Sequence, residues 1–139
     1  MSLERSLILL KPDCLEGRHA GEVIARFEAA GFEMRGVKMI QLTDEILLEH
    51  YSHLTELPFF SGIVEFMKSA PVLALILEGE SAVGRIRELL GPTDSSKAPS
   101  GTIRGDLGKS GMQNVCHASD SVENAQAEIA RFFSESEVF

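Results

Sequence analysis

Several features common in other classes of protein are missing from this chain of 139 residues. No apolar run reaches the roughly 18 residues that a membrane-spanning helix requires. No basic segment followed by a long apolar stretch opens the chain, so we expect no secretory signal peptide. Internal repeats, low-complexity tracts and linkers are absent too. The length suits one domain, residues 1–139, with a core of its own.

Cysteine and positive charge are also scarce. Cys14 and Cys116 are the only two cysteines, and their spacing matches no metal knuckle, so a cytoplasmic chain would keep them as thiols. The formal net charge is −8, which argues against nucleic acid or an anionic membrane as a partner. The same acidity draws attention to each cation that lies beside a candidate phosphate site.

The order of the expected elements predicts an α+β sandwich. Strands are expected at 6–10, 32–42 and 72–77, the first and last from the apolar runs LILL and VLALIL. Helices are expected at 20–30, after residue 43, at 59–69 and at 81–90, and they are placed on one face of the sheet. Whether the strands run parallel stays open. Residues 92–113 are rich in Gly, Ser, Thr and Pro and predict a long, functional loop.

Short-range signals mark several helix ends. Thr43 and Ser81 are expected N-caps, and Gly31 is an expected C-cap. Asp120 with Glu123 fits a capping box for the last helix. The predicted buried stripe of that helix has four members, Val122, Ala125, Ile129 and Phe132.

Two motifs outside these elements are weak. GDLGKS at 105–110 resembles half of a P-loop, but Ile103 stands where the motif requires its first glycine. His50 and His53 are three residues apart on a predicted helix and could share a metal ion. No third ligand is near them in the sequence, so the favoured interpretation is a solvated helix face.

His117 is more informative. It follows the β-type pair Val115-Cys116 and precedes a group of small polar residues at 118–121, where the last helix begins. A helix N-terminus favours anions through its unpaired N–H groups and its dipole. An unprotonated histidine can act as a nucleophile or a base. The combination predicts an enzyme that handles phosphate, although a lone histidine is more often structural.

Several separated motifs then resemble nucleoside diphosphate kinases, in order and spacing. They are NVCHASDS at 114–121, LLKPD at 9–13, HY at 50–51, LPFFSGIVEFM at 57–67, LLGPTD at 89–94 and GTIRGD at 101–106. The resemblance extends over nearly the whole chain from about Leu3. It implies a ferredoxin-like α+β sandwich, a four-stranded antiparallel sheet covered by helices.

The resemblance also implies roles for individual residues. His117 matches the nucleophile that becomes a phosphohistidine when it takes the γ-phosphate, in a ping-pong reaction that passes this phosphate to a nucleoside diphosphate. The implied nucleotide-binding residues are Lys11, Phe59, Arg87, Thr93, Arg104 and Asn114. The implied neighbours of the nucleophile are Tyr51, Ser119 and Glu128, of which Glu128 orients the ring.

Some of these positions have simpler interpretations. Lys11 could be a turn lysine, either Phe59 or Phe60 could be core, and Arg87 is preferred over Arg85 from its distance to Gly91. Glu128 lies at the edge of the buried stripe, where a glutamate often only faces water.

Cofactor and partners follow from the same resemblance. Mg²⁺ is expected on the nucleotide phosphates, with Asp120 as a contact through water and no protein metal cage. The expected partners are nucleoside di- and triphosphates and further copies of the chain, as a hexamer or a tetramer of dimers in the cytoplasm.

Three departures from the family pattern accompany these matches. Ala118 and Cys14 stand where glycine is usual, which raises the question of a positive φ. Ser95 replaces a proline in a loop implied to make subunit contacts.

A catalytically silent nucleotide-binding homologue and a ferredoxin-like ligand sensor are the rival hypotheses.

Overall fold

The computed structural model describes residues 2–139. Its centre is a four-stranded antiparallel sheet with the strand order β2-β3-β1-β4. β1 (Leu3–Leu10) pairs along its whole length with β3 (Val72–Glu80). β2 (Glu33–Ile40) lies on the outer edge of β3, and the short β4 (Cys116–Ala118) lies on the outer edge of β1. The predicted ferredoxin-like α+β fold is confirmed, with all strand pairs antiparallel.

Helices surround this sheet. They are α1 (Pro12–Glu16), α2 (Ala20–Ala29), α3 (Asp44–His50), α4 (Phe60–Lys68), α5 (Ala82–Leu90), α6 (Ile103–Leu107) and α7 (Val122–Phe132), with 3₁₀ turns at Ser52–Leu54, Ser95–Lys97 and Glu135–Glu137. None of the helices within residues 2–139 has the length and apolar character needed to cross a membrane.

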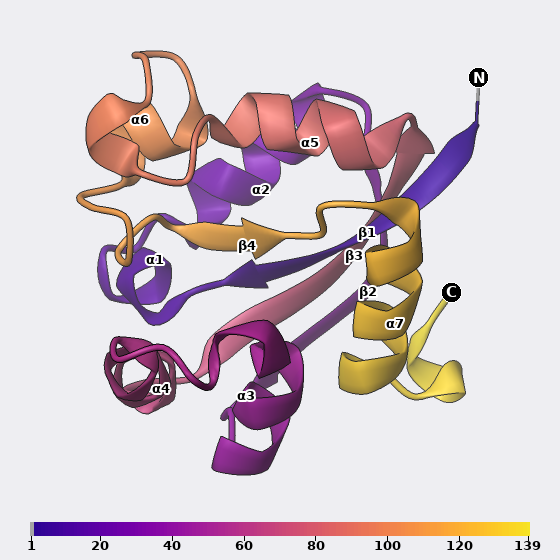
Figure 1. The fold of residues 1–139 in the computed structure, drawn as a ribbon. Coiled ribbons are helices and arrows are strands. Elements are labelled where there is room, and N and C mark those ends of the chain that lie inside the picture. The colour runs from indigo at the N-terminus through magenta and orange to yellow at the C-terminus, as the bar shows by residue number, and fades with distance from the viewer. Residues whose placement is uncertain (1) are drawn as a thin grey trace.

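The helices cover both faces of the sheet, so the prediction of a single covered face was wrong. Ile8 and Leu10 of β1 pack in one apolar cluster with residues of α2 and α5, whereas Leu7 and Leu9 pack in a second cluster with residues of α3, α4 and α7. Figure 1 shows α2 and α5 on one side of the strands and α3 and α4 on the other. Because side chains alternate along a strand, burial of consecutive residues requires two covered faces.

The helix starts agree only in part with the caps expected from the sequence. The Thr43 hydroxyl accepts a hydrogen bond from the Ile46 backbone N–H at 3.3 Å, as predicted for the start of α3. The start of α7 was predicted one residue too early, because the cap is Ser121, which accepts from the Asn124 N–H, and not Asp120. Ser81 precedes α5 without a capping side-chain bond. Val122, predicted to be buried, is exposed.

The segment 92–113 is more ordered than a loop. It contains a 3₁₀ turn and the five-residue helix α6, whose cap Thr102 accepts from the Gly105 N–H at 3.0 Å. A helix this short completes little more than one turn, so no apolar period can develop in its sequence. The segment returns to the sheet at β4, beside β1 (Figure 1).

Candidate active site

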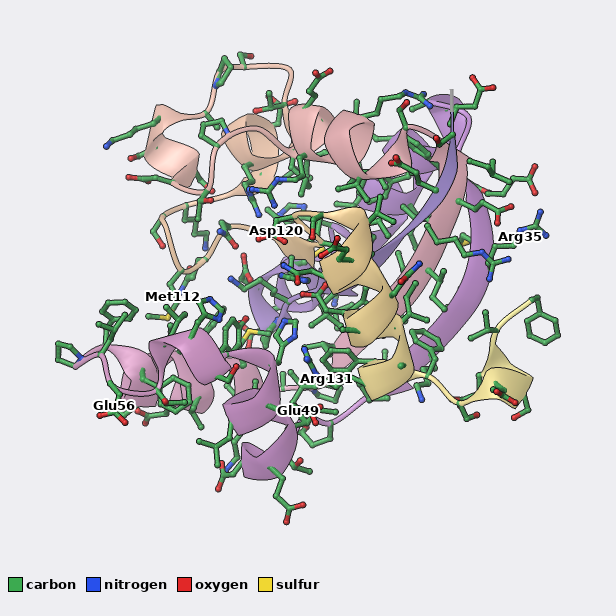
Figure 2. The ribbon with its side chains drawn as sticks, turned by 45° about the vertical axis from the view of Figure 1, so that its right-hand side comes forward. Arg35, Glu49, Glu56, Met112, Asp120 and Arg131 are labelled. Atoms are coloured by element: carbon green, nitrogen blue, oxygen red, sulfur yellow. The ribbon has the colours of Figure 1, made fainter. Side chains whose placement is uncertain are left out.

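A cleft of about 640 Å³ opens beside the ends of β1 and β4. Ten of the side chains singled out from the sequence line it: Lys11, Tyr51, Phe59, Arg87, Thr93, Arg104, Asn114, His117, Asp120 and Glu128. They come from α5, α6, β4 and α7 and from the segments between elements, with Lys11 directly after β1. Met112 and Asp120, on two different walls, are labelled in Figure 2. The fold therefore gathers residues more than 100 positions apart into one cavity large enough for a nucleotide.

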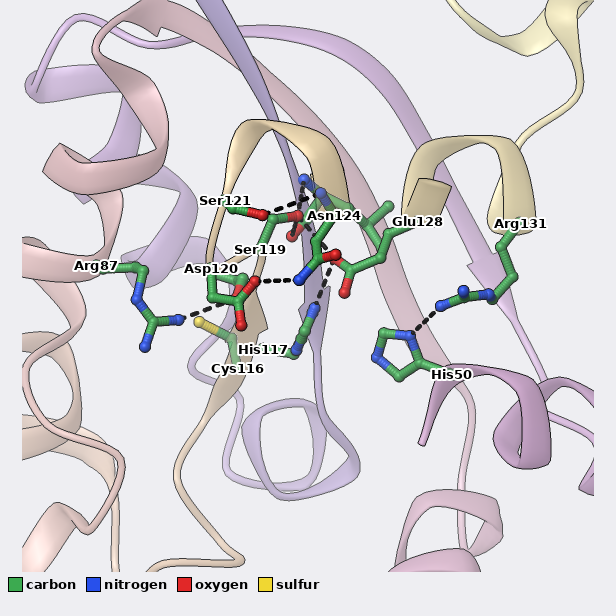
Figure 3. Close-up of polar contacts among 12 residues, drawn as sticks. His50, Arg87, Cys116, His117, Ser119, Asp120, Ser121, Asn124, Glu128 and Arg131 are labelled. Carbon is green, nitrogen blue, oxygen red and sulfur yellow. Dashed lines mark hydrogen bonds and ion pairs between the residues drawn. The ribbon is translucent and has the colours of Figure 1, made fainter. Parts of the chain in front are cut away.

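His117 is held at one end of this cleft by Glu128 of α7, which Ser119, before the start of α7, holds in turn. Its Nε2 lies 3.0 Å from Glu128 Oε1, and the Ser119 hydroxyl donates to the same oxygen at 2.7 Å (Figure 3). Burial disfavours the charged carboxyl, but the His117 and Ser119 hydrogen bonds outweigh it and keep the pKa of Glu128 below its usual value. A carboxylate can only accept, so Nε2 carries the proton and Nδ1 keeps a free lone pair.

Lys11 and Asn114 join β1 to the segment before β4. The Lys11 ammonium donates to the Met112 carbonyl at 2.6 Å and to Asn114 Oδ1 at 2.7 Å, and the Asn114 amide donates to the Thr93 carbonyl at 3.0 Å. Only 8% of Lys11 is exposed. Burial and the nearby Arg104, opposed by Asp13 and Cys116, lower the pKa of Lys11 to about 8. The ammonium is thus fixed in position, and it loses its proton at a lower pH than an exposed lysine does.

Two arginines line the cleft with different freedom. Arg104 is buried, and its guanidinium donates to the carbonyls of Asn114, Gly91 and Cys116 at 2.7–3.1 Å. Arg87 makes one longer bond, 3.3 Å to the Ala118 carbonyl, and so keeps donors for a ligand. Arg85 instead lies over the Phe32 ring and bonds carbonyls away from the cleft. The choice of Arg87 over Arg85 agrees with this geometry, and its role stays a prediction.

Phe59 and Tyr51 occupy the opposite wall. Phe59 is 52% exposed although it is a large apolar residue, so its ring is open to a stacking partner, whereas Phe60 is partly covered. Burial and the neighbouring Glu128 raise the pKa of the Tyr51 hydroxyl to about 12, so this group stays protonated.

A tight turn just before His117 sets the path of the chain. Val115 has φ of 78°, and the Cys116 N–H donates back to the Asn114 carbonyl at 2.9 Å, as in a γ-turn. The Val115 N–H donates to Asp13 Oδ2 at 3.0 Å, and its carbonyl accepts from the Lys11 N–H at 2.9 Å. The strained residue therefore fastens the strand of His117 to the end of β1.

The departures from the family pattern cause no such strain. Neither Ala118 nor Cys14 has a positive φ, because Ala118 is in β4 and Cys14 is inside α1. Ser95 is buried, and its hydroxyl has no hydrogen-bond partner within residues 2–139.

His50 corrects the prediction of a solvated helix face. Only 6% of this residue is exposed, and its ring lies edge-to-face with the His117 ring at 4.6 Å between centroids. Burial, His117, Arg131 and His53 lower the pKa of His50 to about 3 against the opposing effect of Glu128. His53 is exposed, as predicted. Sequence reasoning gave no role to Asp13, although it ends the LLKPD motif, and it missed Arg131, which belongs to none of the motifs.

The fold and a cleft lined by a histidine and three cations fit an enzyme that handles phosphate, and comparisons with known proteins identify the family. The family model described as Nucleoside diphosphate kinase matches residues 4–138. A nucleoside diphosphate kinase of Staphylothermus marinus is 47% identical over 138 residues, which cover 99% of this chain and 98% of the relative. The chain belongs to the nucleoside diphosphate kinase family.

Solved structures agree with this assignment. A crystal form of the Aquifex aeolicus nucleoside diphosphate kinase has a TM-score of 0.95 and 44% identity, covering 99% of this chain and all of the other. A halophilic enzyme of Halobacterium salinarum, in complex with CDP, has a TM-score of 0.95 and 37% identity, covering 99% of this chain and 92% of that one. The protein is accordingly an enzyme that transfers phosphate from a nucleoside triphosphate to a nucleoside diphosphate.

Proposed function

We propose that the transfer is a ping-pong reaction through a phosphohistidine at Nδ1 of His117. The observation that carries this proposal is the hydrogen bond of 3.0 Å between His117 Nε2 and Glu128 Oε1. It leaves Nδ1 unprotonated and available for attack. As positive charge develops on the ring, the Glu128 carboxylate can balance it.

The two half-reactions conserve atoms and charge. The Nδ1 lone pair attacks the γ-phosphorus, the bond from that phosphorus to the β–γ bridging oxygen breaks, and the nucleoside diphosphate leaves with that electron pair. A terminal β-phosphate oxygen of a second diphosphate then attacks the phosphorus on His117. The N–P bond breaks and returns its electrons to Nδ1. The Nε2 proton stays on the ring throughout.

The other residues of the cleft bind and position the nucleotide. Lys11, Arg87 and Arg104 balance the negative charge of the phosphates. An otherwise acidic protein must supply this positive charge at the site itself. Thr93 and Asn114 contact phosphate or ribose, and Phe59 stacks on the base. Tyr51 packs against the His50 ring, which itself contacts His117, and its hydroxyl can donate a hydrogen bond. Ser119 holds the carboxylate of Glu128 in place, as its 2.7 Å bond supports.

Mg²⁺ fits the residues of the cleft as a nucleotide-bound ion. Asp120 is a carboxylate on the cleft wall, and within residues 2–139 the metal-capable group there is His50, His117 and Glu128, which is not the all-oxygen set that Mg²⁺ prefers. Asp120 would hold the ion through a water molecule. When bound, the ion supplies neutralisation of charge on the phosphates.

A broad choice of base accompanies this mechanism. An aromatic face stacks on purines and pyrimidines alike. The CDP complex of the halophilic relative supports acceptance of a pyrimidine nucleotide here. The chain would act as a single domain, as a homo-oligomer in the cytoplasm, with a hexamer or a tetramer of dimers as the expected assemblies.

The experiment that tests the mechanism is phosphate labelling. Incubation with [γ-³²P]ATP should label the protein with an acid-labile, base-stable phosphate, and added GDP should remove the label as GTP. His117→Gln should lose the label while it still binds ADP. His53→Gln, an exposed neighbour, is the control and should label normally. A catalytically silent homologue would bind nucleotide without label, so labelling absent from the unaltered protein would refute the proposal.

A further inference from the structure

Arg131 occupies an unexpected place for an arginine. It lies on the last turn of α7 with 17% of its side chain exposed, and it extends toward α3 rather than into solvent. Its Nε donates to Glu49 Oε2 at 2.7 Å, and its Nη1 lies 2.9 Å from His50 Nδ1. Arg131 and Glu49 are labelled in Figure 2, and the bond to His50 is drawn in Figure 3.

This contact determines the tautomer of His50. A guanidinium has only donors, so Nδ1 of His50 must accept. The proton of the neutral ring is therefore on Nε2. The ion pair with Glu49 keeps the guanidinium from turning away from His50. The guanidinium therefore keeps its bond to Nδ1, and the ring stays in the Nε2–H tautomer.

The His50 ring in turn packs against the ring of His117. Its centroid is 4.6 Å from that of His117, 4.8 Å from Tyr51 and 5.2 Å from Phe132, all edge-to-face. A buried ring in contact with three others has little freedom to rotate. A rotation of His117 away from Glu128 would displace His50, which Arg131 holds.

A metal ion is the competing use of these side chains. His50, His117 and Glu128 have ligand atoms within 4.8 Å of one another, and two histidines with a glutamate are a zinc set. Two observations oppose it. Nε2 of His117 is engaged with Glu128, and the Arg131 guanidinium places a positive charge against the ring that would bind the cation.

We infer that Arg131 is a positioning residue for phosphoryl transfer, which acts by fixing His50 as the Nε2–H tautomer against the His117 ring. The kinetic part of this inference rests on the proposed role of His117, whereas the tautomer does not. The groups that face His50 are His117 from β4, Glu128 and Arg131 from α7, and Tyr51 and His53 from the segment after α3.

The first experiment measures the tautomer directly. In protein labelled with ¹⁵N-histidine, long-range ¹H–¹⁵N correlations distinguish a protonated from an unprotonated ring nitrogen, and the four histidines are assigned from His→Gln variants. His50 should be the Nε2–H tautomer at pH 7. Arg131→Met should mix the two tautomers, and Arg131→Gln, whose amide can still donate, should restore one.

The second experiment measures rates. Arg131→Met should lower kcat by about 10- to 100-fold with little change in KM, because misplacement of the attacking atom affects the transition state more than ground-state binding. Arg131→Gln should recover most of this loss. The matched control is Arg26→Met, which removes an arginine paired with two carboxylates, Glu22 and Asp106, and none of these residues lines the cleft. Thermal melting checks that each variant is folded.

Three results would overturn the inference. One is an Nδ1–H or charged His50 in the unaltered protein. This measurement does not depend on whether His117 is labelled with phosphate. Another is a folded Arg131→Met protein with normal kcat. The third is micromolar zinc inhibition that His50→Gln abolishes, because the cluster would then be a metal site. If labelling of His117 failed while the tautomer was as stated, the proposed function and not the structural assignment would be wrong.

Discussion

The buried ammonium of Lys11 makes the stability of this protein depend on pH in an unusual direction. Lysine ordinarily has a pKa near 10.5, and burial lowers that of Lys11 to about 8. Between these values the unfolded chain binds the proton and the folded chain does not. The free energy of unfolding therefore rises with pH in this window, and the penalty for a buried charge is fully present below pH 8.

The magnitude follows from the same two values. The difference between 10.5 and about 8, at about 1.36 kcal/mol per pKa unit, corresponds to about 3 kcal/mol. Cys14, Cys116 and Tyr51 act in the opposite direction, because burial raises the pKa of each to about 12 and their stabilisation is lost as pH rises through the alkaline range. A variant that lacks only Lys11 separates these contributions.

The assay is urea unfolding of the unaltered protein and Lys11→Met at pH values from 7 to 10.5. The stability of the unaltered protein relative to the variant should become about 3 kcal/mol more favourable over this range. The cysteines and Tyr51 are common to both proteins and largely cancel. A difference that does not change with pH would refute the reasoning, because it would mean that the Lys11 ammonium is not desolvated in the folded state.

Three further results are expected. Phe59→Ala should weaken nucleotide binding by about 1–3 kcal/mol in calorimetric titrations, and acceptance of GDP with outright refusal of CDP and UDP would contradict a stacking contact. Val115→Gly should be more stable to denaturant than Val115→Ala by about 1 kcal/mol, the reverse of the usual order, because only glycine relieves a φ of 78°. Light scattering should detect an oligomer at micromolar concentration, and a monomer would count against the proposed assembly.

The long strands and helices were predictable, and the shortest elements were not. The runs LILL and VLALIL identify β1 and β3 because each residue in them is apolar, but the same continuity already implies burial on both faces. β4 has only three residues and little pattern of its own, and its pairing with β1 depends on tertiary contact. α6 is hidden for a similar reason, since one turn of helix cannot be distinguished from a loop.

The resemblance predicted residues of the cleft, including Glu128 and Ser119 beside His117, but not the contacts behind His50. The resemblance named the residues that line the cleft, because they belong to motifs with fixed spacing. Arg131 and His50 are 81 positions apart, and their contact arises only when α7 packs beside α3. No period or motif in either segment indicates that a guanidinium will reach an imidazole, so only the assembled fold reveals this link.

The strained turn at Val115 connects these observations to catalysis. A β-branched residue at φ of 78° is costly, and it persists here because both of its backbone groups are bonded, to Asp13 and to Lys11. The turn bends the chain sharply at one residue, and Asn114 before it bonds Lys11, whereas His117 after it, in β4, bonds Glu128 of α7. A relaxed extended Val115 would carry the strand past the end of β1. The strained turn thus fastens the segment that leads to His117 to the end of β1, where Lys11 lies.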